Sequence, residues 1–139
     1  MAHDDSTLVR FDRSPVGVLK PQGCFVDNEF PTVPCGDSPK GLTGAHDVAI
    51  SDDGRSLYVA SSSDSAVAEL DRDTATGALT PRRCIKDVEA TGDWQTCNQS
   101  TAGLGGTSDV AVSPDDESVY ATGGFPDDAV VAFSREQAP

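Results

Sequence analysis

The chain repeats itself, and this repeat constrains its fold more than any single residue does. Residues 41–58 read GLTGAHDVAISDDGRSLY and residues 103–120 read GLGGTSDVAVSPDDESVY, so ten of the 18 aligned positions are identical without a gap. The pattern Leu-x-Pro-x-x-Cys also recurs, at residues 19–24 and 79–84. A fixed repeat that is longer than a hairpin and shorter than a domain is typical of proteins built from stacked supersecondary units.

The segments between turn residues alternate apolar and polar side chains with a period of two, which predicts short β-strands. Asp-Gly at 53–54 favours a tight hairpin turn, because this dipeptide tolerates positive φ. No segment carries an apolar stripe with the 3.6-residue period of a helix, so we expect no significant helix. The expected strands are 7–12, 16–21, 47–51, 56–60, 66–71, 78–83, 109–113, 118–122 and 129–133.

The grouping of these strands predicts four-stranded antiparallel β-propeller blades. Inner strands of a propeller crowd around a central channel, which suits the small Val and Ala side chains that open each repeat. We therefore predict an all-β chain of about two blades plus extra strands. Residues 7–21 would form the outer strands of a first blade, 47–83 a complete blade, and 109–134 three inner strands of a further blade. Residues 24–40 and 84–106 would be the inter-blade loops.

Four cysteines fall into two pairs with matching sequence context. No Cys-x-x-Cys is present, so neither a zinc site nor a redox pair is favoured. The expected arrangement is two local disulfides, Cys24–Cys35 and Cys84–Cys97, with free thiols and a metal site as the alternatives. Disulfides indicate an extracellular or periplasmic location. The N-terminus lacks the pattern of a signal peptide, so we expect a segment of a longer protein whose leader lies elsewhere.

The net charge of −13 argues against two classes of partner. Nucleic acid and anionic membrane surfaces both repel such a chain, so neither is an expected partner. No apolar stretch approaches the roughly 20 residues that a membrane-spanning helix needs.

The segment Asp47–Leu79, DVAISDDGRSLYVASSSDSAVAELDRDTATGAL, resembles the repeats of the YVTN and lactonase-like β-propellers. Those repeats run through a strand, an SPDG turn, a Leu-Tyr-Val-Ala strand, a Val-rich strand and D-x-x-T-G. The second copy departs from the pattern at Asp116, where the family has Gly. The cysteine-tied loops resemble those of secreted bacterial members.

This resemblance implies about six to eight blades in one ring. A chain with little more than two blades cannot close a ring, and its open edges favour strand addition. The predicted partner is therefore the chain itself, in a cyclic homo-oligomer that closes the propeller. The alternative is an incomplete piece of a larger propeller.

Four polar residues at the starts of the inner strands are the candidate ligand-binding residues: His46, Asp47, Ser108 and Asp109. His46 could act as a general base, a metal ligand or simply a polar residue at a strand start. A repeated Asp at a strand start usually bonds backbone N–H groups in the adjoining loop. A ring of such carboxylates would suit Ca²⁺, which is the one cofactor that the sequence suggests; otherwise none is expected.

Trp94, the only tryptophan, either packs under the second loop or contacts a sugar or a protein. The sequence contains no Gly-x-Ser-x-Gly and no phosphate-binding loop. We therefore predict a non-catalytic extracellular scaffold that binds a ligand, such as a carbohydrate, or a protein partner. The alternatives are a lactonase-like hydrolase, with His46 and Asp47 at the channel mouth, and a fragment without independent activity.

Overall fold

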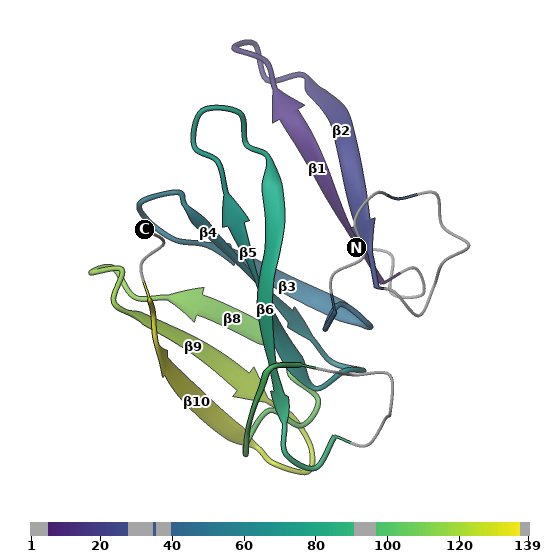
Figure 1. The fold of residues 1–139 in the computed structure, drawn as a ribbon, viewed down its shortest axis with the longest axis vertical. Helices are drawn as coiled ribbons and strands as arrows, with labels where there is room; N and C mark the ends of the chain where they lie inside the picture. Colours follow the sequence, from purple (N-terminus) through teal and green to yellow (C-terminus); the bar gives the residue numbers. More distant parts are fainter. Residues whose placement is uncertain (1–5, 28–34, 36–39, 91–96, 137–139) are drawn as a thin grey trace.

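The computed structural model describes residues 6–27, 35, 40–90 and 97–136, and over these ranges it contains ten β-strands and no helix (Figure 1). The all-β prediction is confirmed, and no segment of this part forms a helix that could cross a membrane. The strands are β1 (Thr7–Arg13), β2 (Leu19–Val26), β3 (Ala45–Ile50), β4 (Ser56–Ser61), β5 (Ala66–Arg72), β6 (Leu79–Asp87), β7 (Gln99–Thr101), β8 (Asp109–Val112), β9 (Ser118–Gly123) and β10 (Ala129–Ser134).

These strands form three sheets. The central sheet has the order β3-β4-β5-β6-β7, in which β3 to β6 are antiparallel and β7 is parallel to β6. The three-stranded sheet has the order β10-β9-β8, and β1 and β2 form a separate hairpin. In Figure 1 the central sheet lies between the hairpin and the three-stranded sheet. The arrangement is that of one blade flanked by parts of two others.

Two predicted strands differ from the structure by more than two residues at one end or both, and one strand was not predicted. The second strand begins at Leu19 rather than at residue 16, because a turn occupies 14–18 with Gly17 at φ +87°, and it extends to Val26, so Cys24 lies in a strand rather than in a loop. The sixth extends to Asp87, which places Cys84 inside a strand rather than in a loop. The short strand β7 lies within the segment expected to be a loop, and three residues are too few to show a period-two pattern.

The sequence repeat is also a structural repeat. β3 and β4 correspond to β8 and β9 in the same register, because Val48 pairs with Val59 as Val110 pairs with Ala121. The turn between each pair requires positive φ at one position, which is Gly54 (φ +70°) in the first copy. Asp116 holds this position in the second copy at φ +65°, a conformation that Asp adopts more readily than most residues.

Strand β4 lies at the centre of the molecule, with all six residues buried. Its alternating side chains contribute to two separate cores. Leu57 and Val59 pack in the core beneath the β1–β2 hairpin, together with Leu70 and Cys84 of the central sheet. Tyr58 and Ala60 pack in the core shared with the three-stranded sheet. The central sheet is thus covered on both faces.

Both expected disulfides are present. Cys24–Cys35 and Cys84–Cys97 have Cα–Cα distances of 5.0 and 4.9 Å. Each bond ties the last strand of a repeat to the segment that leads into the next repeat, and Cys84 is part of the core.

Candidate functional site at the inner strands and between the sheets

The predicted site residues of the first repeat lie on β3. His46 is exposed, whereas Asp47 is half-buried. The carboxylate Oδ2 of Asp47 accepts a hydrogen bond from the backbone N–H of Val110 at 3.0 Å. The expectation of a partner in the adjoining loop is therefore wrong, since Asp47 bonds the neighbouring sheet instead. This carboxylate fixes the start of β3 against β8.

The predicted site residues of the second repeat lie at the start of β8 and form a hydroxyl–carboxylate cluster. Ser108 Oγ donates to Asp109 Oδ2 at 2.7 Å, and Thr122 Oγ1 donates to the same oxygen at 3.3 Å. Asp109 remains exposed. Its carboxylate holds β8 and β9 together and still faces solvent.

Two further expectations concern this region. Trp94 lies outside the described residues, so its predicted contact with the loop or with a ligand stays a prediction. Within the described ranges no group of three or more His, Cys, Asp or Glu side chains is arranged to hold a metal ion. Binding of Ca²⁺ likewise stays a prediction.

A buried ion cluster joins the central sheet to the three-stranded sheet. The guanidinium of Arg135, whose side chain has no exposed surface, donates from Nη2 to both carboxylate oxygens of Asp53 at 2.8 Å. Its Nη1 lies 2.8 Å from Oδ2 of Asp116. Asp116 in turn accepts the backbone N–H groups of Asp52 and Asp53 at 2.9 and 3.1 Å. Two hairpin turns of successive repeats are thus held by one arginine and two aspartates.

This cluster shifts the ionisation of Asp53. Burial of the carboxyl raises its pKa, but hydrogen bonds from Ser51, Arg135 and the backbone of Arg55 outweigh burial and lower the pKa to about 2. Asp53 is therefore charged at all ordinary pH values. Local sequence patterns indicate only a turn at Asp53 and give no role to Arg135. The available signal was an arginine that ends the third strand of each repeat, at Arg13, Arg72 and Arg135.

Two buried aspartates were also missed. Asp87 Oδ2 accepts the backbone N–H of Leu104 at 2.8 Å, and Asp27 Oδ2 accepts that of Leu42 at 2.9 Å. Burial raises the pKa of Asp87, but the bonds from backbone N–H groups dominate and lower it. Both residues stand three positions after a half-cystine, at Cys24 and Cys84, which was the available sequence signal.

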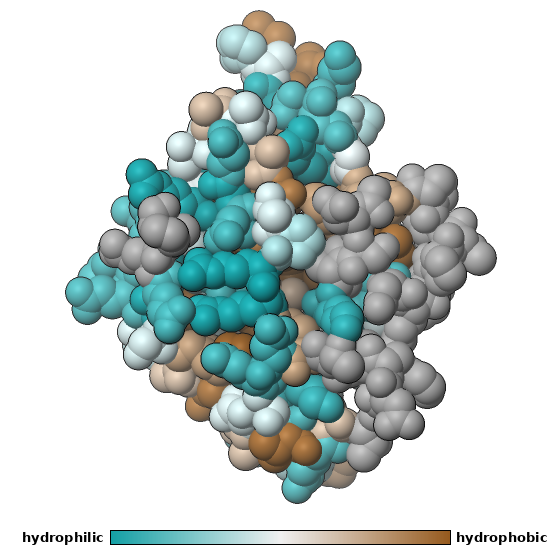
Figure 2. Space-filling model, in the orientation of Figure 1, coloured by the Kyte–Doolittle hydropathy of each residue, from teal (hydrophilic) through white to brown (hydrophobic). Residues whose placement is uncertain are grey.

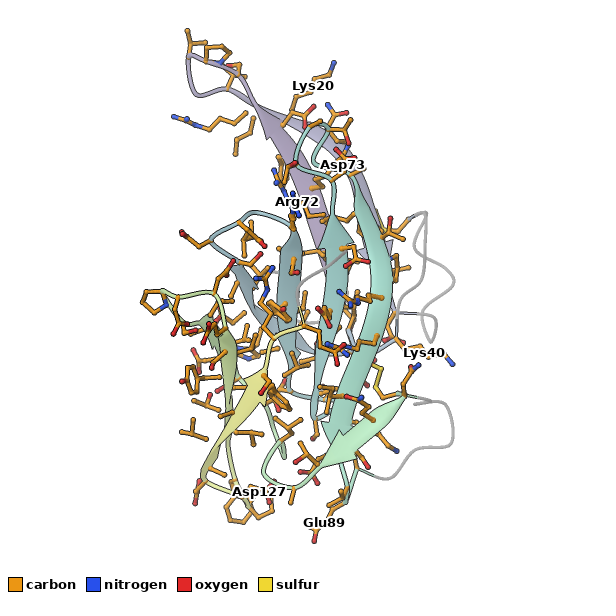
Figure 3. The ribbon with its side chains drawn as sticks, turned by 60° about the vertical axis from the view of Figure 1, so that its left-hand side comes forward. Lys20, Lys40, Arg72, Asp73, Glu89 and Asp127 are labelled. Carbon is orange, nitrogen blue, oxygen red and sulfur yellow. A yellow bond between two sulfur atoms is a disulfide. The ribbon has the colours of Figure 1, made fainter. Side chains whose placement is uncertain are left out.

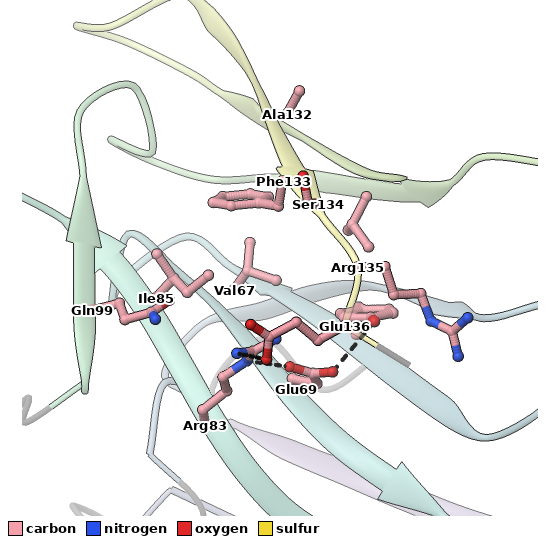
Figure 4. A pocket seen from close by; sticks show the side chains of 12 residues that line it. Val67, Glu69, Arg83, Ile85, Gln99, Ala132, Phe133, Ser134, Arg135 and Glu136 are labelled. Carbon is pink, nitrogen blue, oxygen red and sulfur yellow. Dashed lines mark hydrogen bonds and ion pairs between the residues drawn. The ribbon is translucent and has the colours of Figure 1, made fainter. Parts of the chain in front are cut away.

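A cavity of about 330 Å³ lies between the central and three-stranded sheets (Figure 4). Phe133 forms one side and Val67 and Ile85 form the other, while charged groups line one end. Glu69 pairs there with Arg83 and accepts a hydrogen bond from the Tyr58 hydroxyl at 3.3 Å. Burial, and next the charge of Glu69, raise the pKa of Tyr58. The carboxylate is thus already neutralised by protein donors.

The sheets, their repeat and their order define the class of fold, which is that of β-propeller blades. The chain is similar to the structure of a Bacteroides uniformis protein provisionally assigned as a 6-phosphogluconolactonase, with a TM-score of 0.69 and 16% identity over 98% of this chain and 33% of that one. It is also similar to the periplasmic gluconolactonase of Pseudomonas aeruginosa, with a TM-score of 0.65 and 22% identity over 96% of this chain and 31% of that one. The chain thus spans about a third of the length of these proteins. No protein-family model and no curated protein matches its sequence.

Proposed function

We propose that this chain contributes to a lactonase-like hydrolase whose site lies at the N-terminal ends of the inner strands β3 and β8. The observation that carries the proposal is the fold, which matches proteins named as lactonases over nearly the whole chain. The polar residues at the inner strands are the second support. They were expected at a channel mouth, and the bond from Val110 to Asp47 joins the two strands on which they lie.

Hydrolysis of a lactone makes few demands on protein groups. Water attacks the carbonyl carbon and loses a proton to a base, and the C–O bond of the ring breaks. The ring oxygen then takes up a proton, which leaves a hydroxy acid. A positioned base and hydrogen-bond donors to the carbonyl oxygen would accelerate these steps.

His46 is the candidate base, because imidazole is the usual proton acceptor in proteins near neutral pH. Ser108 occupies the equivalent position of the next repeat and is the candidate donor to a substrate oxygen, once its hydroxyl turns away from Asp109 Oδ2. Asp47 is a positioning residue in this proposal, since its carboxylate is engaged with the backbone of β8.

The charge of the chain favours a neutral lactone over a phosphorylated one. The four candidate residues include two aspartates and no lysine or arginine, and the net charge of the chain is −13. A phosphate dianion would be repelled by this field. We therefore expect gluconolactone itself to be the better substrate.

The proposal is tested by following proton release from gluconolactone and from its 6-phosphate, each corrected for spontaneous hydrolysis. We expect turnover of gluconolactone that falls at least 100-fold in His46→Gln and is unchanged in His3→Gln, which removes the only other histidine. Loss of turnover with EDTA would assign a metal ion to the site. Absence of turnover on both lactones would overturn the hydrolase proposal in favour of a non-catalytic scaffold.

A further inference from the structure

The junction between the central sheet and the three-stranded sheet shows how two successive repeats of this chain bind each other. Its polar contacts include two near the inner strands and two near the outer strands. They are Asp47 Oδ2 with Val110 N–H (3.0 Å), Asp53 with Arg135 (2.8 Å), Ser65 Oγ with Gly106 N–H (3.1 Å), and Asp87 Oδ2 with Leu104 N–H (2.8 Å).

On the opposite side of the central sheet, the two contacts near the outer strands recur with the β1–β2 hairpin. Ser6 Oγ accepts the N–H of Gly44 at 3.1 Å, and Asp27 Oδ2 accepts that of Leu42 at 2.9 Å. Ser6 and Ser65 even share positive φ values, +46° and +50°. The β1–β2 hairpin therefore occupies the place of the outer strands of a preceding repeat.

Near the inner strands of this second junction, the hydrogen-bond donors are present, but, among the described residues, the carboxylates that would accept from them are not. Val48 corresponds to Val110, so its N–H points away from β4. Arg72 corresponds to Arg135, and its Nη1 donates to Gly54 O at 3.0 Å as that of Arg135 donates to Asp116 O at 3.1 Å. In the described chain no carboxylate is bonded to the Val48 N–H or to the Arg72 guanidinium.

A groove of about 520 Å³ lies where the inner strands of a preceding repeat would pack. Val48 is 44% exposed, whereas Val110, its counterpart in the complete junction, is 6% exposed. Figure 3 shows Arg72 at the end of β5 that lies next to the β1–β2 hairpin. We call the apolar and basic lining of this space the groove face; it comprises Val9, Phe11, Val48, Ile50, Arg10, Arg13 and Arg72.

The three-stranded sheet has the complementary surface on its far side. Tyr120 is 42% exposed and Val130 is 70% exposed, although their counterparts Tyr58 and Val67 are buried. Figure 2 shows hydrophobic residues at the surface toward the lower left of the view, where Figure 1 places this sheet. Two exposed carboxylates lie on the same sheet, Asp109 as the counterpart of Asp47 and Asp115 as that of Asp53. We call Tyr120, Asp109 and Asp115, which lie on the β8–β9 hairpin, the far face; Val130 lies on β10 and is not part of it.

We propose that the groove face and the far face are two halves of one interface, and that a second copy of this chain docks head to tail across it. The β8–β9 hairpin of one copy would enter the groove between β1 and β3 of the next. Asp115 would then bind Arg72, and Asp109 would accept the N–H of Val48. Three arginines and one aspartate, Asp12, line the groove of this acidic chain, so its charge is net positive and complements the incoming carboxylates.

The equivalence of β1 and β10 determines how the β8–β9 hairpin docks in the groove. β1 and β10 occupy the same position of the repeat, and they share Val, Phe and Arg at alternate positions, 9, 11 and 13 in β1 and 131, 133 and 135 in β10. Both cannot lie beside β9 at once. In the docked pair β1 replaces β10 along β9, which is an exchange of equivalent elements between copies. The free edge of β1 is available, because in the described structure β1 pairs only with β2.

The test is the solution mass, measured by light scattering after size exclusion from about 5 μM to 500 μM protein without reductant. We expect the mass to rise with concentration toward multiples of 14.4 kDa. Arg72→Asp and Asp115→Arg should each weaken association at least tenfold, because each places like charges opposite each other. The double variant Arg72→Asp/Asp115→Arg should restore association, since it reverses the pair.

Lys20→Asp is the matched control, because it makes the same change of charge at an exposed position on the hairpin. It should leave the association unchanged, and circular dichroism should show that every variant retains its strands. A chain that stays at 14.4 kDa throughout would overturn the proposal. The proposal would also be overturned if both single charge reversals left association intact, or if the double variant failed to restore it. The readout is mass, so these results are independent of any lactonase activity.

Discussion

Substitution of Arg135 tests whether the buried ion cluster holds the two repeats together. The Arg135 side chain is fully buried and touches the carboxylates of Asp53 and Asp116, which are 32% and 12% exposed. Removing one partner of a buried ion pair costs about 3–5 kcal/mol, since the other charge is left uncompensated. Both aspartates can be partly rehydrated here, so we expect Arg135→Ala to lower the free energy of unfolding by about 2–4 kcal/mol.

Arg72→Ala is the matched control. Arg72 occupies the same position of the preceding repeat and makes the same bond to a turn carbonyl, but it has no aspartate opposite it in the described chain. Its loss should cost about 1 kcal/mol or less. Arg135→Lys should fall between the two, because lysine keeps the charge but has only one nitrogen and cannot reach Asp53 and Asp116 through two separate N–H groups as Nη2 and Nη1 do.

Equilibrium unfolding in urea, followed by circular dichroism and by tryptophan fluorescence at low micromolar concentration, measures these differences. Equal slopes among the variants would show that the same surface is exposed on unfolding. The two alanine variants should differ by at least about 1 kcal/mol. If both lose the same free energy, the cluster does not stabilise the junction and the reasoning is refuted.

Three further predictions concern stability. The pKa of Asp53 is about 2 in the folded chain and about 3.9 when unfolded, so its contribution is present above about pH 4 and is lost toward pH 2. After allowance for its exposure, wild type should lose about 1 kcal/mol more than Asp53→Asn over this range in urea titrations, and equal losses would contradict the assignment. Asp87→Ala should destabilise by about 2 kcal/mol in the same assay, because it leaves buried N–H groups unpaired; a loss below about 0.5 kcal/mol would contradict this. Reduction of Cys84–Cys97, which closes a loop with a sequence separation of 13, should cost about 2–3 kcal/mol and lower the thermal midpoint, and an unchanged midpoint with free thiols present would rule this out.

Most of the strands could be predicted from the sequence because their signals are local. Period-two alternation identified nine of the ten strands, and the repeat showed that β3 and β4 correspond to β8 and β9. Matching context around the cysteines was enough to predict both disulfides. The bounds of β2 and the existence of β7 were missed, because a turn displaces the former and the latter has only three residues.

What only the tertiary structure decided is which repeated residues meet across the sheets. Asp47 and Asp53 stand at strand starts and turns in the sequence, where bonds within the same hairpin are the usual expectation. Their partners, Val110 and Arg135, lie more than one repeat further along the chain, and nothing in local spacing specifies such a pair. A hydrogen bond between repeats depends on how two sheets pack, and that packing is set by cores on both faces of β4. The sequence by itself therefore determined the kind of unit from which this protein is built. The packing of the sheets decided which polar residues join one unit to the next, and which are left facing outward.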